Sequence, residues 1–276
     1  MPSVATLQSS LVRTPLAAVE WLGRQTAKFG NEVGYASALL FESLYWLVLG
    51  HWRNQPVRMS AVFKEAVEVG VRAIPIVCIA CFATGTMLAM QGIHTLRQFG
   101  ADSQVVVGIA YSVSREFAPL ITGIFVAGRS GSAVAARIGT MTVSQEIDAL
   151  RVIGVNPVRY LVAPLLIALM FTMPCLTVLA NLVAMLGGAL YCLAALGMPV
   201  EVFFDRSFAA LTTSDLLGGI YKSIAFAMLI AIIGAVNGFQ VKSGAEGVGR
   251  ATTRSVVLCI VSIILADMLV TGFLSR

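Results

Sequence analysis

Four charged residues lie inside otherwise apolar stretches of this 276-residue chain: Arg115, Glu116, Lys222 and Asp267. A charged side chain is costly to place against lipid, so such residues usually face a protein interior or a polar cavity. Two cations and two carboxylates can neutralise one another and brace helices. They can also form a polar site for an anionic headgroup, because the guanidinium fork suits a phosphate and an ammonium adds a point charge. Both roles remain open.

A second group of candidate residues lies in the polar segment 129–159. Acidic residues suit the first turn of a helix, and glycine and proline commonly end one. We predict a short amphipathic helix that Ser144 caps and that Gly154 and Pro157 end. The side chains that such a helix would present are Glu146, Ile147, Asp148 and Leu150. The pattern fits an ordinary surface helix and a docking element equally well.

Other chemistries have little support. The chain has no match to G-x-x-x-x-G-K-[ST], so it does not bind ATP in that manner. Residues 128–132, GRSGS, lack the final glycine of a nucleophile elbow and follow a predicted helix where an elbow follows a strand. The two histidines, His51 and His94, have no metal-site neighbours, and Cys78-x-x-Cys81 lacks a second pair. We expect no catalytic residue, metal or cofactor on this chain.

The composition places these residues in a membrane. Hydrophobic residues make up 58% of the chain and charged residues 12%, whereas soluble domains carry about 25% charged residues. A helix needs about 20 mainly apolar residues to span a bilayer. The predicted spans are about 73–96, 104–128, 160–188, 216–239 and 255–274. The fold class is therefore an all-α integral membrane protein.

The uncharged stretch 160–200 is long enough for one helix or for a hairpin of two, and loop charge separates these alternatives. Cytoplasmic loops carry an excess of Lys and Arg. With five spans, fourteen of the nineteen basic residues lie on the side of the N-terminus, whereas a hairpin would move Lys242, Arg250 and Arg254 outside. We therefore predict five spans, a cytoplasmic N-terminus and an external C-terminus. The net charge of +5 is then a topology signal, and no nucleic-acid partner is expected.

Residues 1–72 precede the first full span and interleave aromatic with basic residues. This mixture is typical of the membrane interface, so we predict amphipathic helices along the cytoplasmic face. Residues 35–50 are apolar apart from Glu42 but short for a span, and they can dip into the membrane without crossing it. The chain thus divides into an interfacial part, 1–72, and a membrane domain, 73–276, with a cytoplasmic loop at 129–159.

Three stretches of the chain resemble the MlaE/YrbE permease family. They are residues 128–164 (GRSGSAVAARIGTMTVSQEIDALRVIGVNPVRYLVAP), 114–119 (SREFAP) and 249–255 (GRATTRS). The resemblance covers roughly residues 60–276. Members of this family are the membrane subunits of Mce-type ABC transporters, which move phospholipids and other lipids.

The resemblance implies a non-enzymatic permease subunit in the bacterial inner membrane that moves phospholipids between membranes of the cell envelope. It implies a homodimer with a lipid cavity along its axis, and a coupling helix within 129–159 that docks on a cytoplasmic ATPase. ATP would then be bound by that partner chain. A ring of Mce-domain subunits and a small cytoplasmic STAS-domain subunit are further partners that the resemblance suggests.

Counting along the predicted spans places Lys222 and Asp267 roughly 9–10 Å below the outer ends of their helices, at about 1.5 Å per residue. We therefore predict a Lys222–Asp267 ion pair. The hypothesis for function is that a phospholipid headgroup contacts Arg115, with Glu116, Lys222 and Asp267 setting the local field.

Two other functions are alternatives. A secondary transporter would couple to protons through Glu116 or Asp267, but the chain shows no inverted repeats with broken helices in matching halves. A non-transporting membrane anchor for a soluble complex would tolerate changes at Arg115 or Lys222.

Overall fold

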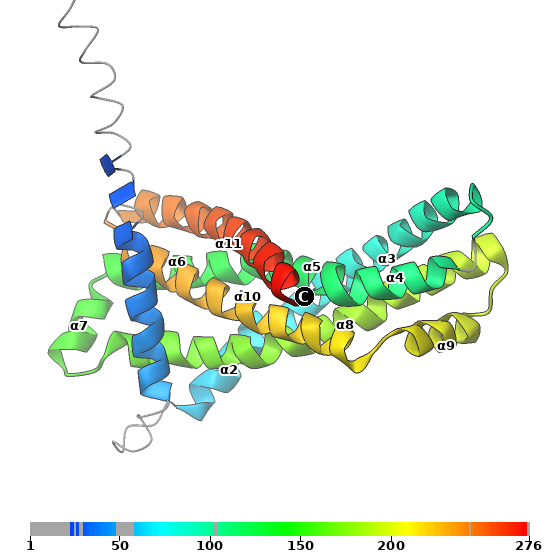
Figure 1. Ribbon diagram of the computed structural model, residues 1–276. Coiled ribbons are helices and arrows are strands. Elements are labelled where there is room, and N and C mark those ends of the chain that lie inside the picture. Colours follow the sequence, from blue (N-terminus) through cyan, green and yellow to red (C-terminus); the bar gives the residue numbers. More distant parts are fainter. Residues whose placement is uncertain are drawn as a thin grey trace, which may run out of the picture.

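A computed structural model describes residues 23–24, 26–27, 30–47, 58–101, 104–242 and 244–274. Across these residues the chain forms helices joined by short turns, with no strand, which confirms the all-α fold class. Five helical stretches are long and apolar enough to cross a membrane: Met59–Arg97, Val105–Val143, Val158–Leu196, Thr213–Phe239 and Gly244–Phe273. The five-span prediction is confirmed, and the stretches lie side by side in an elongated bundle (Figure 1).

The helices that contain the spans are longer than the apolar runs from which they were predicted. Three of them have 39 residues, which corresponds to about 58 Å of helix against a hydrocarbon core of about 30 Å. Their ends therefore extend well past the apolar layer. The structure resolves the stretch 160–200 as one helix, α8 (Ala163–Leu196), which Gly197 ends in a left-handed conformation with φ 67°.

Each of the first three spans contains a change of helical winding that ends two residues before a proline, at Pro75, Pro119 and Pro164. A proline near the start of a helical segment has no N–H and crowds the carbonyl four residues back, so a tighter or wider turn relieves the clash. The first span runs as α2 (Met59–Val69), the 3₁₀ turn η1 (Val71–Ala73) and α3 (Ile74–Arg97). The second runs as α4 (Val105–Ser112), the π turn η3 (Val113–Phe117), α5 (Ala118–Val126), the π turn η4 (Ala127–Gly131) and α6 (Ser132–Val143). The π turn η5 (Val158–Val162) leads into α8.

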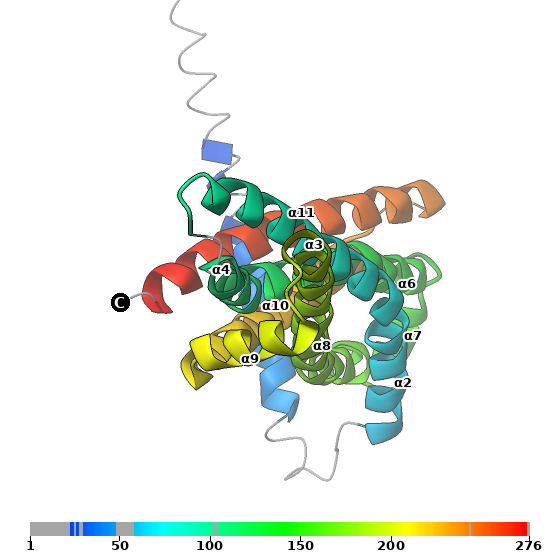
Figure 2. The same cartoon turned by 90° about the vertical axis from the view of Figure 1, so that its right-hand side faces the viewer.

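The first and third spans, α3 and α8, pack against each other through glycines. A Cβ atom at Gly85 would lie 1.8 Å from the backbone oxygen of Ala184, and one at Gly187 would lie 2.4 Å from that of Phe82. Small residues allow membrane helices to approach this closely because side chains do not separate their backbones. At the end of the bundle opposite α7, α3 and α8 meet α4 and the short helix α9 (Val200–Ala210), as Figure 2 shows. Helix α9 was not predicted from the sequence.

The segment 129–159, predicted as a loop with one short helix, is mostly helical. The second span continues through α6 to Val143, and α7 (Glu146–Val152) follows as the predicted short helix. The prediction that Ser144 caps α7 is wrong, because Gln145 occupies the N-cap position with φ 60° and Ser144 still belongs to the end of α6. The Ser144 hydroxyl lies 3.0 Å from the backbone oxygen of Thr140 and 2.8 Å from Glu146 Oε1.

A helix over residues 30–47 crosses the end of the bundle that carries α7, at a steep angle to the spans (Figure 1). Arg254 of α11 (Gly244–Leu274) donates to both carboxylate oxygens of Glu32, at 2.6 and 2.7 Å. Asn156, which follows α7, donates to Glu42 Oε1 at 2.7 Å. The helix is therefore tied to α11 and to the turn that follows α7. The predicted interfacial position of residues 1–72 stays a prediction, and Trp21 and Trp52 lie outside the described residues.

Candidate functional site

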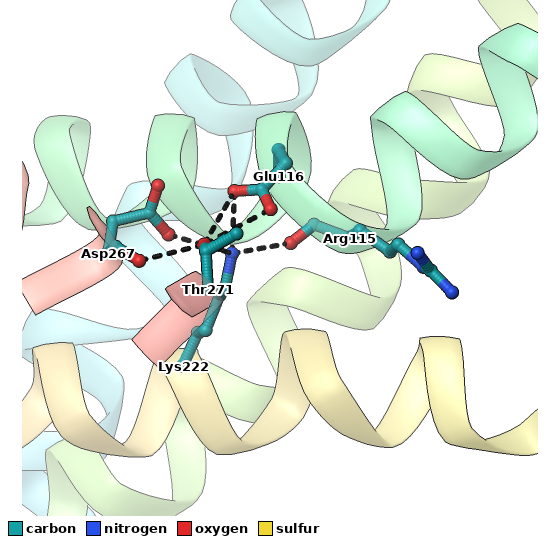
Figure 3. Close-up of polar contacts among 5 residues, drawn as sticks. All are labelled: Arg115, Glu116, Lys222, Asp267 and Thr271. Carbon is teal, nitrogen blue, oxygen red and sulfur yellow. Dashed lines mark hydrogen bonds and ion pairs between the residues drawn. The ribbon is translucent and has the colours of Figure 1, made fainter. Parts of the chain in front are cut away.

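Lys222 of α10 (Thr213–Phe239) lies at the centre of a buried polar cluster between three spans. Its side chain is only 2% exposed. Its Nζ lies 2.6 Å from Glu116 Oε2, 2.8 Å from Thr271 Oγ1, 2.9 Å from the backbone oxygen of Arg115 and 3.0 Å from Asp267 Oδ1 (Figure 3). The predicted Lys222–Asp267 ion pair is confirmed. The cluster also includes Thr271, which the sequence analysis did not single out.

Each of the three N–H groups of Lys222 donates a hydrogen bond. They are directed at Glu116, Thr271 and the Arg115 carbonyl, so the 3.0 Å contact with Asp267 is an ion pair without a directed hydrogen bond. The Thr271 hydroxyl accepts from Lys222 and has one proton of its own. That proton can go to the Asp267 carbonyl at 2.8 Å or to Glu116 Oε1 at 3.2 Å. A lysine satisfied in this way braces α10, α11 and the second span.

A glycine allows α10 to come close enough for these contacts. A Cβ atom at Gly219 would lie 2.6 Å from the backbone oxygen of Ser114, in the π turn η3. Lys222 lies three residues further along α10, on the same helix face. The close approach at Gly219 therefore brings Lys222 within reach of the Arg115 carbonyl in the same turn.

Arg115 behaves differently from the other three predicted residues. Its carbonyl joins the cluster, but its guanidinium points away along the second span (Figure 3) and its side chain is 57% exposed. Nε donates to Asp215 Oδ1 at 2.6 Å, and Nη2 contacts the same oxygen. The guanidinium carbon also lies 5.1 Å from the centre of the Tyr111 ring. The structure thus brings Glu116, Lys222 and Asp267 together and separates the Arg115 side chain from them.

Asp215 is a second residue of the site that was not predicted from the sequence. Its side chain is 2% exposed. It takes part in a capping box at the start of α10, in which the Thr212 backbone N–H and hydroxyl both lie within 2.9 Å of Asp215 Oδ2. The signal in the sequence was Thr212-x-x-Asp215 directly before an apolar run, a variant of the capping-box pattern. The predicted span began at residue 216, so this carboxylate was counted as part of a loop.

A small cavity connects the two groups. Its volume is about 90 Å³, enough for a few water molecules and too small for an acyl chain. Its lining residues are Arg115, Glu116, Ser214, Asp215, Gly218, Lys222 and Thr271. A polar group such as a phosphate can therefore approach the exposed side of Arg115, while Lys222 forms the buried wall.

The residues predicted to contact an ATPase lie on α7 with different exposures. Glu146 and Asp148 are exposed, and Asp148 pairs with Arg151 at 3.2 Å. Leu150 is half-buried, whereas Ile147 is buried against the bundle and is therefore not presented for docking. The most exposed apolar side chains here are Val152 and Ile153, at 87% and 71%. Among the described residues no group of three or more His, Cys, Asp or Glu side chains is placed to hold a metal ion.

Comparison with known proteins assigns the family. Residues 62–273 match the family model described as "Permease MlaE". A probable ABC transporter permease protein of Rickettsia typhi is 31% identical over 255 residues, which cover 92% of this chain and 96% of that protein. The "Intermembrane phospholipid transport system permease protein MlaE" of Haemophilus influenzae is 29% identical over 254 residues, 92% of this chain and 95% of that protein. The "Protein TRIGALACTOSYLDIACYLGLYCEROL 1, chloroplastic" of Arabidopsis thaliana is 33% identical over 223 residues, 81% of this chain and 62% of that protein. This multi-pass membrane chain therefore belongs to the MlaE permease family.

Proposed function

We propose that this chain is the permease subunit of an ABC transporter that moves phospholipids between membranes of the cell envelope. Its family and the name of the Haemophilus influenzae relative support this proposal. The chain itself carries no cofactor, and ATP is bound and hydrolysed by a separate cytoplasmic subunit. The protein lies in the bacterial inner membrane, with the N-terminus and the segments 129–159 and 240–254 in the cytoplasm and the C-terminus in the periplasm.

The observation that carries the proposal is the exposed Arg115 guanidinium beside a polar cavity inside an apolar bundle. Asp215 engages Nε and Nη2, and the contacts of the described residues leave Nη1 available. A phospholipid phosphate can accept from that nitrogen in a charge-assisted hydrogen bond. Lys222 then holds the Arg115 carbonyl in place, and Glu116, Lys222 and Asp267 set the local field.

The proposed assembly is a homodimer with a lipid cavity along its axis. The fifth span leaves more of its surface uncovered than the others: 11% of its apolar window is buried inside the chain, against 28% to 56% for the other four. A second copy would cover part of that surface. The ATPase would dock on α7 through Glu146, Asp148 and Leu150, and a ring of Mce-domain subunits and a small STAS-domain subunit would complete the complex.

The test uses the complex purified through this subunit from native membranes, reconstituted into vesicles. We expect an ATPase to co-purify with this subunit. The Arg115→Ala variant should retain less phospholipid and transport it at least about tenfold more slowly. A tenfold loss corresponds to about 1.4 kcal/mol, which is the size expected for one hydrogen bond to a charged group. Arg206→Ala, which removes an exposed arginine from α9, is the matched control.

The alternatives predict other results. A proton-coupled transporter would work without an ATPase and would require a pH gradient. A membrane anchor would leave lipid content and transport unchanged in Arg115→Ala, and that outcome would rule out the headgroup contact.

A further inference from the structure

A second cavity lies at the end of the bundle that carries α7. It lies between α2, α6, η5 and the start of α8, and Leu150 of α7 also lines it. Its volume is about 790 Å³, far larger than the cavity beside Arg115. Four cationic residues and one carboxylate line it: Arg58, Lys64, Arg137, Arg159 and Glu65. The excess of positive charge indicates an anionic ligand.

The inner wall of this cavity contains an incompletely satisfied ion pair. Arg137 Nη1 lies 2.7 Å from Glu65 Oε1, and the two side chains are 38% and 14% exposed. Arg137 Nε and Glu65 Oε2 are buried and have no hydrogen-bond partner among the described residues. Buried donors are normally satisfied by a protein group, water or a ligand. The Glu65 carboxylate therefore satisfies only part of the Arg137 guanidinium, and the ion pair forms a charged inner wall.

The rim of the cavity combines cations with aromatic rings. The Arg58 guanidinium lies 6.0 Å from the centre of the Tyr160 ring, and that of Arg159 lies 5.4 Å from the Trp46 ring. Arginine beside tyrosine and tryptophan is typical of the level at which lipid headgroups lie.

The outer face of α2 adds an apolar surface next to these cations. Met59, Phe63 and Val67 recur every four residues and are 61%, 67% and 52% exposed. Such a stripe on a helix is suited to acyl chains, and Lys64 directly follows Phe63 in the chain. A free phosphate would use only the cationic cavity, whereas a phospholipid would use both surfaces.

We propose that this cavity binds the phosphate headgroup of an anionic phospholipid from the cytoplasmic leaflet, with its acyl chains along α2. Basic pockets between membrane helices on the cytoplasmic side are a recurrent way to hold such headgroups. The choice of leaflet rests on the topology proposed above. The site shares no lining residue with the Arg115 cavity, so lipid binding here can be tested independently of the proposed headgroup contact at Arg115.

The test compares the full-length protein with Arg58→Gln/Lys64→Gln in nanodiscs that contain phosphatidylcholine and phosphatidylglycerol. Arg58 makes no side-chain capping bond to α2, so glutamine can replace it without loss of the helix. Native mass spectrometry would count the retained phosphatidylglycerol. Since each basic residue near a membrane surface contributes about fivefold in affinity for anionic lipid, we expect the preference to fall by about tenfold or more.

The matched control is Arg72→Gln/Arg250→Gln. It removes two exposed cations, each of which pairs with a glutamate four residues earlier in the chain and does not line this cavity. The control should keep the preference of the wild-type protein, and both double variants should melt at the wild-type temperature.

Several results would overturn the proposal. One is an unchanged preference for phosphatidylglycerol in Arg58→Gln/Lys64→Gln, and another is an equal loss in the control. Displacement of the lipid by millimolar inorganic phosphate alone would identify a site for free phosphate. Loss of a co-purified ATPase with full retention of lipid would identify a protein contact. The Arg115→Ala variant separates this site from the proposed function, because it should still retain phosphatidylglycerol here.

Discussion

Lys222 Nζ lies 2.6 Å from Glu116 Oε2, and the lysine side chain is 2% exposed inside a bundle of apolar helices. The contact divides the intramembrane charges into two groups with different roles. The buried lysine is satisfied by Glu116, Thr271 and a backbone carbonyl, and so holds helices together. Arg115 remains the cation that a ligand can reach, because its side chain is 57% exposed.

The first prediction concerns this buried lysine. Lys222→Met should lower the free energy of unfolding by about 3 kcal/mol, because removing one partner leaves Glu116 and Asp267 without a countercharge. Thermal unfolding in detergent measures the loss. Lys242→Met, at an exposed position, is the control and should have no effect. A Lys222→Met protein as stable as the control would show that the cluster does not brace the fold.

The second prediction separates the two roles of Asp215. Asp215→Asn weakens both its ion pair with Arg115 and the capping box, so it should lower stability and change the amount of co-purified phospholipid. Thr212→Ala removes part of the capping box and leaves the Arg115–Asp215 pair intact, so it should cost about 1 kcal/mol of stability with normal lipid content. If Thr212→Ala changed lipid content as much as Asp215→Asn, the effect would come from the helix end and not from Arg115.

The third prediction concerns the approach of α10 to η3. Gly219→Ala should lower the free energy of unfolding by about 1–3 kcal/mol, because its Cβ would lie 2.6 Å from the Ser114 backbone oxygen. Gly108→Ala, in α4, meets no atom within 4 Å and should be neutral or slightly stabilising. Urea or thermal unfolding of the two variants in parallel checks the difference. Equal stability of the two would contradict the close approach.

The fourth prediction concerns α7. Glu146→Lys/Asp148→Lys should reduce lipid-stimulated ATP hydrolysis by the reconstituted complex, because it reverses the charge that we propose faces the ATPase. The side chains of both residues are exposed, so the permease should remain folded. Glu246→Lys, whose side chain is 82% exposed on α11, is the control for a charge reversal elsewhere. Normal ATP hydrolysis with normal assembly in the α7 variant would exclude a docking role.

The fifth prediction concerns topology. In a background without cysteine, Ser144→Cys should react with an impermeant thiol reagent from the cytoplasmic side and Ser275→Cys from the opposite side. Ser144 is exposed in the structure, and Ser275 lies beyond the described residues. Five spans require the two positions to lie on opposite faces, so labelling of both from one side is the result that this topology does not permit.

Much of the fold could be predicted because hydropathy reports the membrane directly. A membrane span needs about 20 mainly apolar residues in a row, and such a run can be recognised in the sequence without knowledge of the rest of the fold. The ends of the helices were less predictable. Hydropathy does not mark where a helix continues beyond the apolar layer, as α6 does to Val143. The capping role of Ser144 was misjudged for the same reason.

By itself, the sequence determined the class of the protein, its five spans, its family motifs and the Lys222–Asp267 pair, since these follow from local composition and depth. Only the tertiary structure decided which charges are satisfied and which are accessible. Arg115 and Asp215 are 100 residues apart in the chain, and Glu116 and Lys222 are 106 apart. Their pairing depends on how closely α10 approaches η3 at Gly219, and no local pattern encodes that distance.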